Sequence, residues 1–306
     1  MTHARSPRAL LALAISLVLW ASAFAGIRAG LRGYSPAEVA LLRYVTGSLI
    51  LAAYAALVRM RLPAPRDLPG LALTGALGFT AYNLLLNYGE VTVSAGAASL
   101  LVASMPIWSS LLARFFLADR LRPLGWLGIL VSFAGVALIA AGEAGGLRLN
   151  LHALLILAAA IASSIYTIVQ KRYLVRYGAL QFTAYTMWFG TLFLLPFAWS
   201  LPHTLPRAPL AATLACIYMG IFPAAIAYVL YGYYLARAAA TRAVSVLYVI
   251  PVLAILVAWL WLGEVPRGLS LVGGAISLAG VAVVQLWGHA RPQGAGSSAR
   301  ALSSRL

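Results

Sequence analysis

The sequence predicts an all-α polytopic membrane protein, with ten transmembrane helices arranged as a 5+5 inverted-topology repeat and both termini in the cytoplasm. Composition, ten apolar stretches and an internal repeat carry this prediction. Of the 306 residues, 63% are hydrophobic and 9% are charged, against about 45–50% and about 25% in soluble domains. A soluble enzyme and a disordered chain are excluded, because so few charged residues cannot cover a surface that faces water.

Ten apolar stretches are long enough for spans, since a helix needs about 20 apolar residues to cross a bilayer. They run over 9–31, 36–58, 68–88, 94–117, 124–141, 151–170, 180–201, 208–236, 241–262 and 268–287. Gly, Ser and Pro clusters at 33–36, 63–69 and 202–209 separate several of them. The stretch after Arg8 is too long for a signal-peptide core and lacks a clear cleavage site, so it is predicted as the first span. Residues 288–306 are predicted to form a disordered cytoplasmic tail.

The distribution of basic residues predicts the orientation. With the N-terminus inside, sixteen Lys and Arg residues fall in cytoplasmic segments and five in outside connections, as the positive-inside rule requires. The basic residues stand singly between apolar stretches, which excludes a nucleic-acid binder with one basic face. The lone Cys216 offers neither an internal disulfide nor a metal cluster, so no metal or cofactor is predicted. The Arg-rich, Lys-poor usage is typical of a GC-rich bacterial source, and the predicted location is the bacterial cytoplasmic (inner) membrane.

The two halves of the chain match each other when one is shifted by 145 residues. The paired positions include Gly75/Gly220, Leu85/Leu230, Tyr88/Tyr233, Pro106/Pro251, Asp119/Glu264, Gly128/Gly273, Ser132/Ser277 and Gly135/Gly280. Spans 3–5 align with spans 8–10 without a gap, whereas spans 1–2 match spans 6–7 only weakly. Because five is odd, the repeats 9–141 and 151–287 enter the membrane in opposite orientations. Many secondary transporters have this architecture, with the substrate site near the midplane between the halves.

The segment from Tyr88 to Val136 resembles the EamA repeat of the drug/metabolite transporter superfamily, and 233–281 resembles it again. The first helix, with Trp20-Ala-Ser-Ala-Phe-Ala-Gly-Ile-Arg28, is similar to the Trp-containing first helix of that family. The resemblance implies ten helices, both termini inside, a cavity lined by spans 1, 3, 4, 6, 8 and 9, and export of small metabolites. Within the superfamily the chain looks most like the YddG-type exporters of aromatic and other amino acids. Asp119, where the family more often has Glu, is a mild departure.

Polar residues inside spans are rare and costly, so they mark candidate site positions. In span 3, Thr80, Asn83, Asn87 and Glu90 fall on one helix face, and Tyr82 borders that stripe. The stripe predicts a water-filled substrate path. The alternative is that the two Asn side chains join helices through hydrogen bonds.

Further candidates for the substrate pathway come from five other spans. They are Trp20, Ser22, Ser104, Trp108, Ser163, Tyr166, Tyr228 and Tyr248. A mid-span tryptophan favours a cavity role, with a lipid-facing position as the alternative. Pro106 and Pro251 each free a carbonyl four residues earlier. They are predicted hinges for alternating access or, alternatively, passive kinks.

Three charged residues and one set of small residues complete the prediction. Arg43 lies within span 2 and pairs with a substrate carboxylate, pairs with Glu38, or extends to the interface. Asp119 and Glu264 end spans 4 and 9 and are predicted to cap or gate through Arg partners. The Gly128–Gly135 and Gly273–Gly280 faces predict a packing seam between spans 5 and 10.

The predicted function is transport of small amphipathic solutes, most of all aromatic and other amino acids. No HExxH pair, phosphate-binding loop or GxSxG elbow is present, so no catalytic residue and no ATP-driven transport are predicted. The expected partners are a small-molecule substrate and membrane lipids. A multidrug or organic-cation exporter is the alternative, and a membrane enzyme or lipid-handling protein is a further class. No mid-membrane acid is found in the predicted spans, which favours downhill export or exchange over proton coupling.

Overall fold

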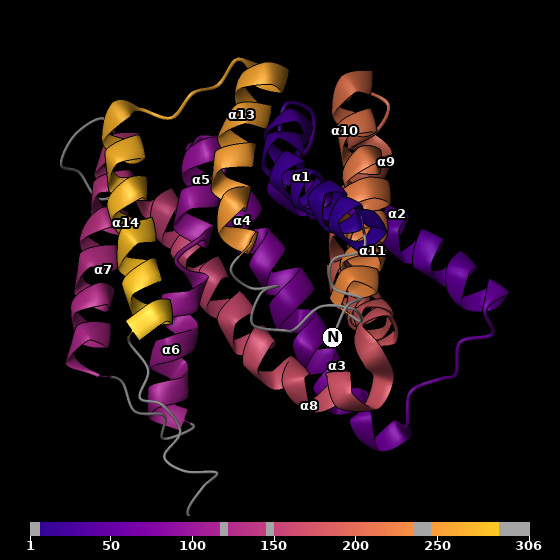
Figure 1. The fold of residues 1–306 in the computed structure, drawn as a ribbon. Coiled ribbons are helices and arrows are strands. Elements are labelled where there is room, and N and C mark those ends of the chain that lie inside the picture. Colours follow the sequence, from indigo (N-terminus) through magenta and orange to yellow (C-terminus); the bar gives the residue numbers. More distant parts are fainter. Residues whose placement is uncertain (1–6, 117–121, 145–149, 236–245, 288–306) are drawn as a thin grey trace, which may run out of the picture.

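The computed structural model describes residues 7–116, 122–144, 150–235 and 246–287, and within these ranges the chain forms helices and no strands. Figure 1 shows them as a bundle in which α7 and α14 lie side by side. The first half contains α1 (Pro7–Gly30), α2 (Pro36–Leu57), η2 (Pro65–Asp67), α3 (Leu68–Gly75), η3 (Ala76–Ala81), α4 (Tyr82–Gly89), α5 (Ala95–Val102), α6 (Met105–Phe116) and α7 (Pro123–Ala144). Asp119 and the predicted tail 288–306 lie outside the described residues.

The second half has a similar succession of helices. It contains α8 (Leu151–Leu194), η4 (Leu195–Ser200), α9 (Leu201–Thr204), α10 (Leu210–Ile221), η5 (Phe222–Ile226), α11 (Ala227–Leu235), η6 (Val246–Val249), α13 (Ile250–Leu262) and α14 (Gly268–Trp287). Eight helical stretches in the described ranges are long and apolar enough to cross a membrane, and Leu247–Leu262 is a shorter apolar helix. The protein is therefore a multi-pass membrane protein.

The connection predicted at 171–179 is shorter than expected, because the helix that begins at Leu151 continues as far as Tyr177. The chain has no helix-breaking residue there until Gly178, which has a φ of 71° inside α8. Only glycine adopts this left-handed conformation at little cost. The interruption is thus a single residue rather than a loop.

The contacts of span 3 show that α8 reverses direction at Gly178. As the residue numbers rise along span 3, the numbers of their contacts in the first part of α8 fall. The numbers of their contacts in the second part of α8 rise. The pairs in close contact are Gly70 with Tyr173, Gly78 with Tyr166 and Gly89 with Ile156, and then Gly75 with Thr186 and Phe79 with Gly190. The two parts of α8 therefore run antiparallel to each other.

The predicted span 94–117 is interrupted, since α5 ends at Val102 and α6 begins at Met105. The interruption comes immediately before Pro106. In the second half, the 3-10 helix η6 comes immediately before the helix that holds Pro251. Proline removes an N–H donor and displaces the carbonyl of the preceding turn, which accounts for the gap before α6 and for the 3-10 turn before α13.

Two π-helices also occupy equivalent places in the repeats. η3 follows Gly75 and η5 follows Ile221, one residue after Gly220. π-helices are rare and are often found at functional sites. Nothing in the sequence pattern predicted them.

The seam predicted between spans 5 and 10 corresponds to α7 packed against α14. Ser132 and Ser277, which are repeat equivalents, share a hydrogen bond of 3.0 Å. A Cβ at Gly135 would lie 2.3 Å from the Ser277 nitrogen, and one at Gly280 would lie 2.5 Å from the Ser132 nitrogen. Each helix therefore offers the same contacts to the other, which is the pattern of a two-fold axis.

The same symmetry holds between α2 and the second part of α8. Ser48 and Thr191 share a hydrogen bond of 2.7 Å between their hydroxyls. Gly47 packs on the Gly220 carbonyl, and Gly190 packs on the Gly75 carbonyl. Ser48 and Thr191, like Gly47 and Gly190, correspond under a shift of 143 residues, whereas Gly75 and Gly220 correspond under 145. The change of two residues explains why an ungapped shift of 145 found only a weak match for spans 1–2 and 6–7.

Candidate functional site

Five aromatic side chains meet where α1, η3, α8 and α11 come together, and we call them the aromatic cluster. The Trp20 ring centroid lies 5.3 Å from that of Tyr228 and 4.8 Å from that of Tyr231. Phe79 lies 6.2 Å from Tyr228 and 6.0 Å from Tyr166. Aromatic residues predicted on separate spans thus lie together in one cluster, in which Phe79 connects Tyr166 to Tyr228.

A buried polar group adjoins the aromatic cluster. The Asn83 amide accepts a hydrogen bond of 3.1 Å from the Arg43 Nη1 and donates one of 2.6 Å to the Tyr44 hydroxyl. The Arg43 guanidinium lies over the Tyr44 ring, at 5.2 Å from its centroid. The Tyr44 ring in turn lies 5.4 Å from Phe79. Arg43 and Asn83 are both buried, so this group places a positive charge inside the bundle.

The interpretation that Arg43 pairs with Glu38 is wrong. Glu38 forms a capping box with Ser35 at the start of α2. Its carboxylate also accepts hydrogen bonds from the hydroxyls of Ser200, at 2.7 Å, and Thr204, at 2.8 Å. These bonds use Glu38 to fasten α2 to η4 and α9. They hold the carboxylate at the start of the helix, and Arg43 instead donates a hydrogen bond to Asn83.

Ser104, Trp108 and Tyr248 form a second group around Phe133. The Trp108 Nε1 donates a hydrogen bond of 3.2 Å to the Ser104 hydroxyl, and its ring lies 5.1 Å from Phe133. Tyr248 and Phe133 pack against the same hydrophobic core between α6, α7 and α14. These three predicted residues therefore gather beside the α7–α14 seam.

One end of the bundle is held closed by Arg28. Its Nη2 lies 3.0 Å from the Glu264 carboxylate, and its Nη1 donates hydrogen bonds to the carbonyls of Glu90, at 2.6 Å, and Val91, at 3.1 Å. One side chain of α1 thereby joins the end of α4 to the segment between α13 and α14. We call this set of contacts the Arg28 lock.

The remaining predicted residues take part in contacts between or within helices. At the same end as the Arg28 lock, Asn87 donates to the Pro36 carbonyl at 2.9 Å. The Ser22 hydroxyl shares a hydrogen bond of 2.8 Å with that of Tyr218. Tyr82 packs against the largest hydrophobic core, and the Ser163 carbonyl accepts a hydrogen bond from Thr167.

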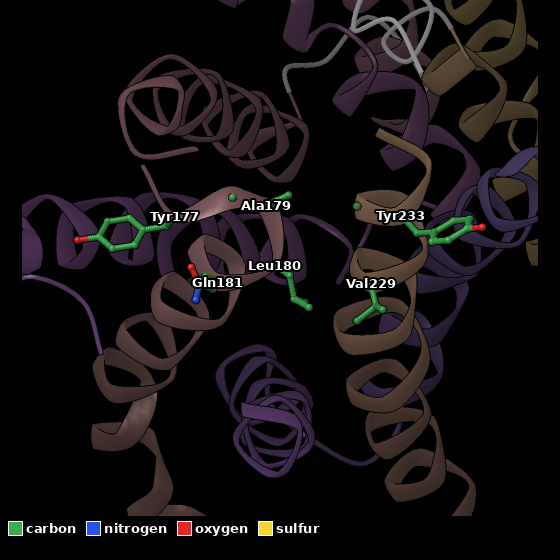
Figure 2. Close-up of a pocket in the computed structure, with 8 residues that line it drawn as sticks. Tyr177, Ala179, Leu180, Gln181, Val229 and Tyr233 are labelled. Atoms are coloured by element: carbon green, nitrogen blue, oxygen red, sulfur yellow. The ribbon is translucent and has the colours of Figure 1, made fainter. Parts of the chain in front are cut away.

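A cavity of about 380 Å³ opens between the turn at Gly178 and α11. Its lining is mostly apolar, with Leu180 and Val229 pointing toward the gap and Tyr177 and Tyr233 pointing away (Figure 2). The other lining residues are Gly178, Ala179, Gln181 and Gly232. Nothing in the sequence pattern predicted this cavity.

The cavity and the Arg28 lock lie at opposite ends of the bundle. Gly33, in the turn that follows α1, packs on Pro209 immediately before α10. From there α10, η5 and α11 carry the chain to Gly232, a rise of about 33 Å for 22 helical residues. The cavity is therefore about one membrane thickness away from the lock.

Positions that are equivalent in the two repeats differ in their contacts at the two ends. Asn87 and Pro36 are joined by a hydrogen bond. Their equivalents are Gly232 and Ala179, which line the cavity. The helices are thus joined at the Arg28 lock, whereas the repeat-equivalent helices leave a cavity between them at the opposite end of the bundle.

Several residues of the site were missed or given little weight in the sequence analysis. Tyr44, Phe79 and Tyr231 complete the aromatic and polar groups, and Arg28 forms the lock. Arg43 carried a signal, because it is a cation within the predicted span 36–58. The aromatic residues carried none, since such residues are common throughout a membrane bundle.

Comparisons with known proteins agree with this architecture. A transporter named YdfC from Bacillus subtilis is 45% identical over 88% of each chain. A "probable terminal-alkyne amino-acid exporter" from Streptantibioticus cattleyicolor is 44% identical over 90% of this chain and 93% of its own. A solved crystal structure aligns over 90% of this chain and 95% of its own with a TM-score of 0.59 and 22% identity, which supports the fold alone.

The family model of the EamA-like transporter family matches residues 7–141 and again residues 150–286. Both matches and the names of the relatives indicate a transporter rather than an enzyme. The resemblance noted in the sequence is confirmed. The chain therefore is a membrane transporter that belongs to the EamA-like transporter family.

Proposed function

We propose that this transporter exports small amphipathic solutes, most of all aromatic and other amino acids, from the bacterial cytoplasm by alternating access. The observation that carries the proposal is the pairing of a closed end, at the Arg28 lock, with a cavity at the repeat-equivalent place of the other end. A carrier must be able to close either end in turn. The 44% identical relative from Streptantibioticus cattleyicolor, with its printed name of amino-acid exporter, supports the solute class.

The proposed topology has ten spans and both termini in the cytoplasm. The reversal at Gly178 divides α8 into two antiparallel parts, and the apolar helix Leu247–Leu262 adds one further crossing. With the eight candidate stretches, these two features support ten. The excess of Lys and Arg in the predicted inner segments supports the orientation. The cavity then faces the cytoplasm.

The proposed pathway runs through the aromatic cluster. Trp and Tyr faces stack on rings and attract cations, which suits the apolar side chain or the ammonium group of an amino acid. Residues of this pathway are Trp20, Ser22, Tyr82, Asn83, Asn87, Ser104, Trp108, Ser163, Tyr166, Tyr228 and Tyr248. Pro106 and Pro251 are the proposed hinges. Pro106 follows the interruption between α5 and α6, and Pro251 follows the 3-10 helix η6.

Replacing Trp20 by alanine is expected to lower efflux of aromatic amino acids from proteoliposomes by about tenfold, because an aromatic pair contributes up to about 1.5 kcal/mol beyond its buried area. Efflux of radiolabelled amino acids and of organic cations is measured in the same preparation. The control is Trp199→Ala, at a tryptophan that is 78% exposed. Equal efflux in both variants would contradict the pathway, and flux of organic cations without amino acids would favour the drug-exporter alternative.

We propose downhill export or exchange as the mode of transport. Wild-type proteoliposomes are expected to equilibrate an amino acid across the membrane and to show no accumulation when a pH gradient is imposed. Accumulation against the amino-acid gradient under an imposed pH gradient would show proton coupling instead. The matched measurement uses the same vesicles with the gradient dissipated by an ionophore.

A further inference from the structure

Four unpaired polar atoms gather at the Arg28-lock end of α2 and α4. Among the described residues, five buried side-chain nitrogen or oxygen atoms have no hydrogen-bond partner, and four of them belong to Arg43, Asn87 and Glu90. They are the Arg43 Nε, the Asn87 Oδ1 and both carboxylate oxygens of Glu90. Such groups are costly in an apolar interior. Three residues of one neighbourhood therefore lack a partner of complementary chemistry.

The three side chains lie along one face of the bundle. Asn83, Asn87 and Glu90 are spaced i, i+4 and i+7 and share one side of α4 and its end, over a rise of about 10 Å. Arg43 bonds to Asn83, and Asn87 bonds to the Pro36 carbonyl at the start of α2. Asn83 lies one helical turn from Asn87, so the bond from Arg43 to Asn83 brings its guanidinium to about one turn from Asn87.

In the described part of the chain, neither Arg43 nor Glu90 takes part in an ion pair. The ion pairs found in the described part of the chain are Arg28–Glu264 and Arg176–Asp67. Arg43 and Glu90 are 7% and 0% exposed. Glu90 interacts electrostatically with Arg28 and, to a smaller extent, with Arg43, and it forms an ion pair with neither. Arg43 has Asn83 and the Tyr44 ring as partners, and both are neutral. A buried charge without a partner of opposite sign is strongly unfavourable.

We propose that Arg43, Asn87 and Glu90 form a binding site for a zwitterion, in which Arg43 holds the carboxylate of an amino acid and Asn87 with Glu90 holds its ammonium group. This inference rests on the proposed function and assigns its substrate class. The Nε–H of Arg43 supplies a donor for the carboxylate, and the Asn87 and Glu90 oxygens supply acceptors for the ammonium. A simple anion would leave Glu90 unpaired, and a simple amine would leave Arg43 unpaired.

The site adjoins the aromatic cluster, which gives the solute side chain a place. Tyr44 contacts both Arg43 and Phe79, so a side chain that extends from the zwitterion site reaches the rings. Because Asn87 also closes α2 onto α4 at this end, occupation of the site and the state of this end are linked. The solute enters when the bundle opens around these residues.

The test compares L-phenylalanine with two analogues, phenethylamine, which lacks the carboxylate, and 3-phenylpropionate, which lacks the ammonium. Competition with radiolabelled phenylalanine is measured on purified full-length protein in proteoliposomes. Wild type is expected to prefer phenylalanine over each analogue by at least about tenfold, since one charged hydrogen bond separates them. Arg43→Gln is expected to remove the preference over phenethylamine, and Glu90→Gln the preference over 3-phenylpropionate.

Control variants keep these outcomes distinct. Arg267→Gln and Glu143→Gln make the same changes outside the site and are expected to keep both preferences. Arg43→Lys keeps the charge and is expected to retain part of the preference over phenethylamine. If both site variants weaken all three compounds equally, the residues are structural and the zwitterion site is wrong. If wild type transports phenethylamine and phenylalanine equally well, the zwitterion site is wrong but the proposed export is not. If wild type transports none of the three compounds, the proposed function fails for this solute class.

Discussion

Gly135→Ala is expected to destabilise the protein strongly, by about 1–3 kcal/mol or more, as overpacking does in a well-packed interior. The new Cβ would lie 2.3 Å from the Ser277 nitrogen and 2.5 Å from the Gly273 carbonyl oxygen. Both are backbone atoms of α14, so no side-chain rotation relieves the clash and the two helices must separate. The apparent melting temperature in detergent is expected to fall by at least about 4 °C.

The lone cysteine provides the measurement and a neighbouring glycine provides the control. Cys216 is fully buried, so its reaction with a thiol-activated fluorophore on heating reports unfolding. Gly268→Ala makes the same substitution in α14 at a place where a Cβ would meet nothing within 4 Å. It is expected to leave the melting temperature unchanged or to raise it, because alanine is the better helix former. Equal melting temperatures for the two variants would contradict the tight seam.

Arg28→Ala is expected to open the end that the Arg28 lock closes. The variant loses the Glu264 pair and the hydrogen bonds to the Glu90 and Val91 carbonyls. A charged hydrogen bond contributes about 1.5–3 kcal/mol when protected from water and less when partly exposed, so a roughly tenfold rise in the open population is expected. Amino-acid transport is expected to slow, because an end that cannot stay closed interrupts the cycle.

Labelling of Cys216 in nanodiscs measures this opening without any added cysteine. Its sulfur packs on Gly30, near the lock on α1, and a charged maleimide reaches it only when α1 and α10 part. Glu264→Gln is expected to raise the labelling rate as well, and the double variant is expected to add little to Arg28→Ala, since both changes break one interaction. Arg207→Ala, at an exposed arginine before α10, is the control. A labelling rate for Arg28→Ala equal to that of the control would contradict the lock.

The helix borders and the repeat could be predicted because they depend on local chemistry. Proline and glycine clusters mark where helices stop, and a shared ancestry of the halves leaves Pro106 and Pro251 in register. The continuation of α8 to Gly178 could not be predicted in the same way. Its basic residues look like a connection, yet nothing in 171–177 prevents a helix, and only the neighbouring helices show where the chain turns.

The site was harder to predict than the fold. Polar and aromatic stripes identified Trp20, Asn83, Tyr166 and Tyr228, but a stripe does not say which side chains of other helices face it. Arg43 illustrates this, since its nearby carboxylate in sequence, Glu38, is bound to hydroxyls of η4 and α9. Its actual partner, Asn83, is 40 residues away. Contacts of that range depend on how whole helices pack.

The meeting of Ser132 with Ser277 also constrains how this chain can change over generations. Each of these serines faces its own counterpart, so a bulkier residue in one half must be accommodated by a smaller one in the other, and a single change meets the full steric penalty. Along this line the two halves cannot diverge independently. The α7 and α14 segments are therefore expected to stay similar to each other in sequence for longer than the loops of the two halves do.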